Sequence, residues 1–320
     1  MPPLRLSAAA WSSIGLVVMW SSGFIGAELG TRTASATTLL AWRFGLIGAI
    51  AAAWLLLRRR RTGVRDLTVQ AVIGLLSQVG YLYGVVRAAE LGVSAATSAL
   101  IAALQPIVAT ATAALVLSER LGWRLVAGLV IGLGGTGLVV SADLAAAATA
   151  PWWAYAFPVA AMLSLVAGTV YERRAHRHRR APNMADGLAV QFVISGIVFT
   201  ALAAATGRLT PPASREFWIA VAWVIVLSTI GGYGCYWTVA SRAGVTRVSA
   251  LLYLTPPATG LWAWLMFGQA IVALSLLGMV VCTAAVALIV APRRTPRPAK
   301  PQPTEPRPVE PRPAEAQAVP

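Results

Sequence analysis

The chain has 320 residues, of which 58% are hydrophobic and 12% are charged, and its formal net charge is +15. A soluble domain is about 25% charged, so this composition excludes an ordinary soluble globular protein. Short basic clusters separate apolar stretches that are about one bilayer thick, which is the pattern of a polytopic membrane protein and not of a nucleic-acid-binding one. We therefore expect the chain to lie in the lipid bilayer and to bind no nucleic acid.

Apolar stretches of the length that spans a bilayer repeat along the whole chain. The uncharged run from Val248 to Pro292 is too long for one span, and Phe267-Gly268-Gln269 divides it, because glycine permits a tight turn. We predict an all-α membrane protein with ten transmembrane helices. The expected helices cover residues 8–29, 36–57, 66–88, 93–117, 122–141, 152–172, 184–206, 216–239, 245–267 and 270–291.

The orientation follows from the positions of the basic residues. With both termini in the cytoplasm, 21 of the 26 Lys and Arg residues lie on the cytoplasmic side, 4 lie outside and Arg43 lies within the membrane. Cytoplasmic loops of membrane proteins are enriched in these residues. We therefore expect a multi-pass protein of the cell (plasma) membrane with both termini cytoplasmic.

An internal repeat divides the chain near residue 150. At a spacing of 150 residues, Pro106 matches Pro256 and Gly128 matches Gly278, while Glu119 is matched by Gln269. Five helices in each half is an odd number, so the second half would run upside down relative to the first. We predict two inverted five-helix repeats, at residues 8–141 and 152–291, and carriers with alternating access are built in this way.

Residues 292–320 differ from the rest of the chain. They contain ten of the twenty prolines, a density that prevents helix formation. We expect a disordered, Pro-rich cytoplasmic tail. Docking to a partner or contact with anionic lipid is the alternative role for this segment.

Several motifs carry a resemblance to a known family. They are Trp20-Ser-Ser-Gly-Phe, Trp42-Arg43-Phe44, Pro106-Ile followed by Ser118-Glu119-Arg120-Leu121 and Gly128, and in the second half Pro256-Pro257 and Gly278. In this order and duplication, the chain resembles the EamA-type carriers of the drug/metabolite transporter superfamily over residues 10–291. It departs from them at Gly268-Gln269, where the family usually has Gly-Glu, so the resemblance implies no role for a carboxylate there.

The resemblance implies a secondary transporter that exports or exchanges a small metabolite such as an amino acid. A flippase for a lipid or lipid-linked sugar is the first alternative, and an integral-membrane enzyme is the second. The sequence has no acidic cluster or His/Asp spacing for catalysis and no nucleotide loop of the Gly-x4-Gly-Lys type. We therefore expect no enzyme activity, no cofactor and no metal site, and the oligomeric state stays open.

Arg43 is the residue within the predicted spans that calls for an explanation. It lies about seven residues into its helix, and so about 10 Å below the outer membrane edge. Charges at this depth usually face the bundle interior and mark functional sites. It would either anchor a substrate carboxylate or join helix ends, with Glu28, Glu90 and the carbonyls freed at Pro106 as partners. Glu28 is also the candidate coupling group for protons.

Proline breaks and polar or aromatic side chains define the expected substrate path. Proline removes a helix hydrogen bond, and bent helices at equivalent places of two repeats indicate the binding site. The expected breaks are at Pro106, Pro256 and Pro257. Besides Arg43, the candidates for the path are Trp20, Ser21, Ser22, Gln78, Tyr81, Tyr83, Thr97, Ser98, Gln105, Ser164, Tyr233, Tyr236, Trp237 and Tyr253.

Overall fold

The computed structural model describes residues 8–58, 63–116, 123–145, 150–177, 183–269 and 272–290. Within these ranges the secondary structure is helical and contains no strand, which confirms the all-α fold class. The Pro-rich tail and Glu119 lie outside the described residues.

Within the described ranges, six helical segments are long and apolar enough to cross a membrane, by length and composition. They are Trp11–Thr31, Ala36–Arg58, Val64–Glu90, Trp152–Ala175, Met184–Ala205 and Arg215–Arg242. Shorter apolar helices lie at Ala95–Ala109, Val126–Ala142 and Ala273–Ala284. The chain is therefore a multi-pass helical protein.

The helices before residue 146 begin and end close to the expected positions. They are α1 (Ala8–Thr31), α2 (Ala36–Arg58), α3 (Val64–Gly74), the π-helical η1 (Leu75–Gly80), α4 (Tyr81–Glu90), α5 (Ala95–Ala103), α6 (Gln105–Val116) and α7 (Trp123–Ala145). Ser94 caps α5, because its side chain accepts a hydrogen bond from the Thr97 N–H at 3.2 Å.

The later helices follow the same order. They are the 3₁₀-helical η2 (Trp152–Tyr155), α8 (Ala156–Ala175), α9 (Met184–Ala205), α10 (Arg215–Trp223), the π-helical η3 (Val224–Gly231), α11 (Gly232–Ala243), α12 (Val245–Leu252), α13 (Thr255–Phe267) and α14 (Ala273–Val290). Gly268 ends α13 with a φ of 66°, a left-handed conformation that favours glycine. The expected turn at this glycine is confirmed.

Two of the ten expected helices are interrupted. The segment at 93–117 is divided at Leu104, directly before Gln105-Pro106, into α5 and α6. The segment at 245–267 is divided at Tyr253–Leu254 into α12 and α13, with proline at the start of α13. Both interruptions precede a proline, which cannot donate the hydrogen bond that would continue the helix.

Two further helices contain a π-helical section that the sequence pattern did not predict. It is η1 between α3 and α4, and η3 between α10 and α11. Side-chain hydroxyls bind backbone carbonyls in both sections: Ser164 Oγ donates to the Leu76 carbonyl at 2.8 Å, and Thr229 Oγ1 donates to the Val224 carbonyl at 2.9 Å. Sections of this kind often lie at functional sites.

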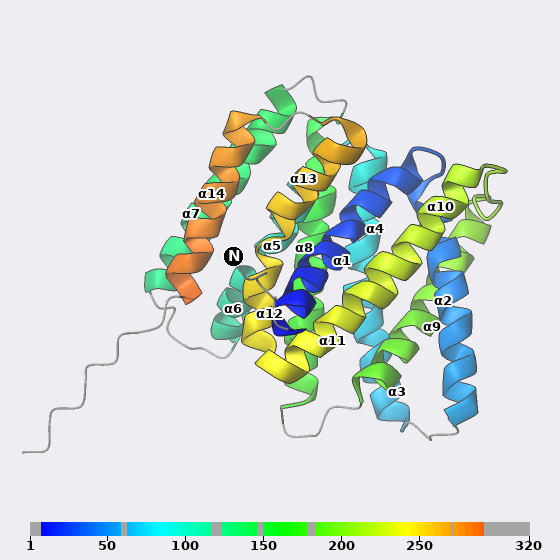
Figure 1. Cartoon of the computed structure of the whole chain (residues 1–320). Coiled ribbons are helices and arrows are strands. Elements are labelled where there is room, and N and C mark those ends of the chain that lie inside the picture. The colour runs from blue at the N-terminus through cyan, green and yellow to red at the C-terminus, as the bar shows by residue number, and fades with distance from the viewer. Residues whose placement is uncertain are drawn as a thin grey trace, which may run out of the picture. The chain divides into compact units, whose positions relative to one another are not determined.

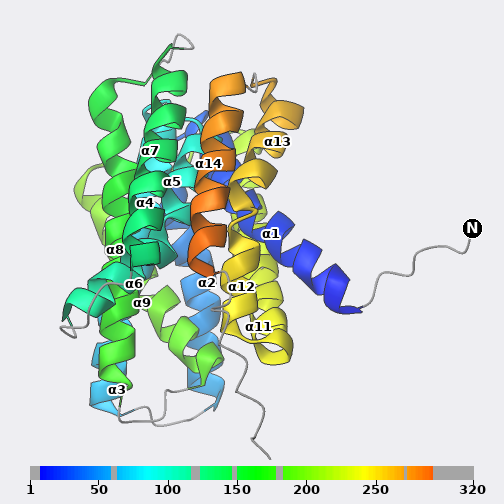
Figure 2. The same ribbon diagram turned by 90° about the vertical axis from the view of Figure 1, so that its left-hand side faces the viewer.

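The crossing of α2 and α9 is reciprocal, and the two helices lie side by side in Figure 1. A Cβ added to Gly48 would lie 2.9 Å from the Phe192 carbonyl oxygen, and one added to Gly196 would lie 2.6 Å from the Phe44 carbonyl oxygen. The two glycines are 148 residues apart in the sequence, and so are the two phenylalanines that they face. Helices α7 and α14 form a second close pair, visible in Figures 1 and 2.

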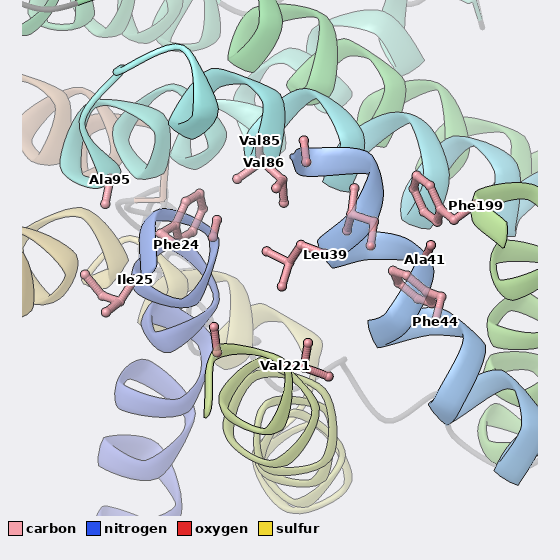
Figure 3. Close-up of a cluster of buried hydrophobic side chains, with 14 of the residues drawn as sticks. Phe24, Ile25, Leu39, Ala41, Phe44, Val85, Val86, Ala95, Phe199 and Val221 are labelled. Atoms are coloured by element: carbon pink, nitrogen blue, oxygen red, sulfur yellow. The ribbon is translucent and has the colours of Figure 1, made fainter. Parts of the chain in front are cut away.

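The largest hydrophobic cluster lies where α1, α2, α4, α9 and α10 meet (Figure 3). Phe44 and Phe199 are fully buried there and stack with their ring centroids 5.5 Å apart. Phe24 of α1 and Val85 and Val86 of α4 belong to the same cluster. These last three residues also line the cavity described below, so the cluster forms part of its wall.

Candidate functional site

A cavity of about 100 Å³ lies between α1, α2, η1, α4, α8, η3 and α11, and we call it the Arg43 chamber. A cavity that holds one water molecule has roughly 10–15 Å³ of free volume, so the chamber has room for a small organic group. Five of the expected path residues line it: Trp20, Arg43, Gln78, Tyr81 and Tyr233.

Arg43 is 4% exposed, and its partners differ from those expected. Its Nη2 donates to Thr229 Oγ1 at 3.0 Å, and its guanidinium lies 5.2 Å from the centre of the Phe44 ring. Glu28 instead pairs with Arg32, and Glu90 with Arg87. The expectation that either glutamate pairs with Arg43 was wrong, because each has an arginine close to it in sequence: Arg32 in the turn after α1 and Arg87 on α4.

The charge of Arg43 is therefore not neutralised by any carboxylate in the described part of the chain. Its Nε, buried within the protein, has no hydrogen-bond partner among the described atoms. A charged group buried without a counter-ion is costly, and such groups mark functional sites in membrane proteins. The arrangement leaves the guanidinium able to bind an anionic group in the chamber.

A chain of glutamines extends from this chamber toward α3. Gln78 Nε2 donates to Tyr233 Oη at 2.6 Å and to Gln191 Oε1 at 3.4 Å. Gln191 Nε2 in turn donates to Gln70 Oε1 at 2.8 Å. All three glutamines are buried, so each amide group needs these partners. The network joins α3 and η1 to α9 and α11.

A second cavity of about 50 Å³, the apolar chamber, lies between the two helix interruptions. It shares Trp20, Phe24, Tyr81 and Leu165 with the Arg43 chamber, so the two chambers adjoin. Its other lining residues come from both sides of the interruptions: Ala99, Ala102, Ala103, Gln105, Pro106, Leu252, Tyr253 and Thr255.

Glu28 does not line either chamber. It borders a separate cavity of about 240 Å³ together with Arg32 and Gln269. Its Oε1 lies 3.1 Å from Arg32 Nη2 and accepts a hydrogen bond from Gln269 Nε2 at 2.7 Å. Gln269, which replaces the glutamate usual in the resembled family, thus binds a carboxylate instead of providing one.

The other expected path residues lie apart from the chamber walls. Tyr236 packs against Trp20 with ring centroids 5.8 Å apart, and Trp237 is 63% exposed. Ser21, Ser22 and Ser164 donate to backbone carbonyls. Tyr83 lies half-buried beside the core, and Thr97 and Ser98 are buried on α5. Pro256 and Pro257 border a void of about 10 Å³.

Several residues at the site were missed by the sequence analysis. Thr229 binds Arg43, Ser77 and Ser228 line its chamber, and Gln191 binds Gln78. The spacing of about 150 residues contains a signal for them. Ser77-Gln78 recurs as Ser228-Thr229 after 151 residues, and Gln191 follows Arg43 after 148.

Comparison with known proteins gives consistent results. A curated relative from Streptantibioticus cattleyicolor, named "Probable terminal-alkyne amino-acid exporter", is 26% identical over 292 residues, covering 89% of this chain and 94% of the relative. A solved crystal structure is similar in fold, with a TM-score of 0.60 and 22% identity, over 88% of this chain and 97% of that one.

The model of the EamA-like transporter family matches residues 7–141 and again residues 152–291. These two matches cover most of the chain, and they agree with its apolar helices and its similarity to an exporter. Family and relative point to a transporter and not to an enzyme, and they do not favour a flippase. The chain belongs to the EamA-like transporter family and is a small-metabolite exporter of the membrane.

Proposed function

We propose that the protein exports an amino acid and that Arg43 binds the carboxylate of this substrate. The observation that carries the proposal is the buried guanidinium at the chamber wall, with one hydroxyl partner and no carboxylate partner among the described residues. Arginine binds carboxylates through two parallel hydrogen bonds. An amino-acid carboxylate supplies the missing counter-charge.

The chamber also suits the ammonium group of an amino acid. Trp20, Tyr81 and Tyr233 bring aromatic rings to its wall, and Trp20 packs edge-on against Tyr233 at 5.7 Å. Aromatic faces attract cations. The relative's printed name, an amino-acid exporter, supports the same class of substrate.

We further propose that ten spans form two inverted repeats. Four pairs of features recur about 150 residues apart: the two π-helical sections, the two interruptions before proline, the reciprocal glycine contacts of α2 and α9, and the two family matches. A two-fold axis in the membrane plane accounts for all four. Alternating access then moves one repeat against the other around the Arg43 chamber.

We also propose that the protein lies in the plasma membrane with both termini in the cytoplasm. The distribution of 21 basic residues inside against 4 outside supports it. Reporter fusions after Arg60 and after Arg180 are both expected to give cytoplasmic signals. A periplasmic signal at either position would contradict the ten-span topology.

The proposed function is tested by measuring amino-acid export from cells with and without the protein, over all common amino acids. We expect the protein to raise export of at least one of them. Arg43→Lys keeps the charge and loses the planar fork, so it should retain part of the export, whereas Arg43→Ala should abolish it. Ser195→Ala serves as the control, because Ser195 is buried and its hydroxyl donates to the Gln191 carbonyl of its own helix. Full export by both Arg43 variants would remove the proposed role.

A further inference from the structure

The apolar chamber has a composition unlike that of the Arg43 chamber. Helix α5 contributes three alanines, Ala99, Ala102 and Ala103. The remaining wall of the chamber is mainly aromatic and aliphatic. Gln105 is occupied by a hydrogen bond from its Nε2 to Thr169 Oγ1 at 3.2 Å. The chamber therefore offers a group that enters it mostly apolar contacts.

The wall of the apolar chamber combines small and large residues that lie at equivalent positions of the two proposed repeats. At the spacing of 150 residues, Ala102 and Ala103 correspond to Leu252 and Tyr253. All four residues line the same cavity, where they flank the two helix interruptions. Large side chains on one side and methyl groups on the other leave the free volume of about 50 Å³.

The two chambers together have the layout of an amphipathic ligand. The guanidinium lies in one, the apolar walls form the other, and Trp20 and Tyr81 border both. A molecule with a carboxylate at one end and an apolar side chain at the other would satisfy the buried charge and fill the second chamber.

We infer that the substrate is an amino acid with an apolar side chain, and that Ala99 and Ala103 limit the size of that side chain. This inference rests on the proposed function, because it assigns the carboxylate to Arg43. Burial of the side chain in the apolar chamber favours binding in proportion to the apolar area removed from water. A charged side chain would lose its hydration there without gaining a partner.

The experiment compares export of radiolabelled L-leucine, L-alanine and L-glutamate in wild type and in Ala103→Leu. Ala103→Leu adds a larger side chain to the wall of the chamber, where Tyr253 already lies at the equivalent position. We expect leucine export to fall at least about tenfold relative to alanine export, since well-packed sites tolerate added methylenes poorly. Glutamate export should be low in both proteins.

Ala160→Leu is the matched control, because it makes the same change at an exposed position of α8. It should leave the ratio of leucine to alanine export unchanged. An unchanged ratio in both Ala103→Leu and Ala99→Leu, with the variants present at wild-type level, would overturn the inference and leave the proposed function intact. Absence of export of any amino acid by wild type would instead overturn the proposed function.

Discussion

The two segments that match the family model, residues 7–141 and 152–291, have several backbone features in common and differ in their chemistry. Arg43 binds Thr229, and Gln191, 148 residues after Arg43, binds Gln78. Thr229 in turn lies 151 residues after Gln78. The contact between Arg43 and Thr229 is thus matched by a contact between the equivalent residues Gln191 and Gln78. The first contact includes a charged side chain and the second does not.

Backbone features that recur in both segments differ in distribution from the residues of the candidate site, which do not recur. Glycine contacts, π-helical sections and helix interruptions occur in both segments, which favours a role in packing over a role in substrate binding. The guanidinium and the alanines of the apolar chamber occur only in the first half. Substitutions at equivalent scaffold positions of the two segments should therefore lower stability by similar amounts. Substitutions at equivalent site positions should differ in their effect on export.

The largest expected effect comes from Arg43→Gln, which makes the two equivalent positions identical. Losing a charge-assisted hydrogen bond costs roughly 1.5–3 kcal/mol, so export per folded molecule should fall by about 10- to 100-fold. Gln191→Met keeps the volume and removes the hydrogen bonds on the other side. It should lower thermal stability and retain most of the export per folded molecule. Equal loss of export in both variants would contradict the proposal that Arg43 binds substrate while Gln191 only stabilises the fold.

Next come the reciprocal glycines of α2 and α9. Gly48→Ala and Gly196→Ala each force a Cβ against a backbone carbonyl, and overpacking costs about 1–3 kcal/mol. Both should lower the melting temperature in detergent by similar amounts. Gly45→Ala is the control on α2, since its Cβ would lie 3.7 Å from the nearest atom, Thr200 Oγ1. A large fall in the melting temperature for Gly48→Ala but not for Gly196→Ala would show that the two glycine contacts are not equivalent.

A smaller effect is expected for Glu28→Gln. The Glu28–Arg32 pair is half-exposed on the arginine side, at 52%, so losing it should cost at most about 1 kcal/mol. We expect a pH gradient to drive little concentrative flux in proteoliposomes, any such flux to vanish in Glu28→Gln, and ATP to have no effect. Strong proton-driven flux that survives this substitution would place the coupling group elsewhere.

The smallest effect is expected for truncation after Arg294. The removed segment is rich in proline, has little apolar surface to bury and has no counterpart in the first half. The shortened protein should insert into the membrane and melt at the wild-type temperature. Loss of the protein from the membrane fraction would show that the tail stabilises the bundle.

The sequence predicted the helices well and the site only in part. Apolar length and the prolines predicted where the helices lie and where they are interrupted, at Leu104 and at Tyr253–Leu254, whereas the ten-span topology stays a prediction. Arg43 was recognised because a charge in an apolar run is conspicuous. Its partner Thr229 was not, because a threonine in a span carries no such signal, and which side chains share a cavity depends on helix rotation. Trp237 was expected on the path and lies exposed for the same reason.

The central claim is that Arg43 binds the carboxylate of the substrate. Binding of L-leucine and of L-leucinamide, which lacks the carboxylate charge, to wild type and to Arg43→Gln tests it most directly. We expect wild type to bind leucine about 10- to 100-fold more tightly than the amide, as the loss of a charge-assisted hydrogen bond implies. Arg43→Gln should bind the two alike. The same preference for leucine in both proteins would contradict the account.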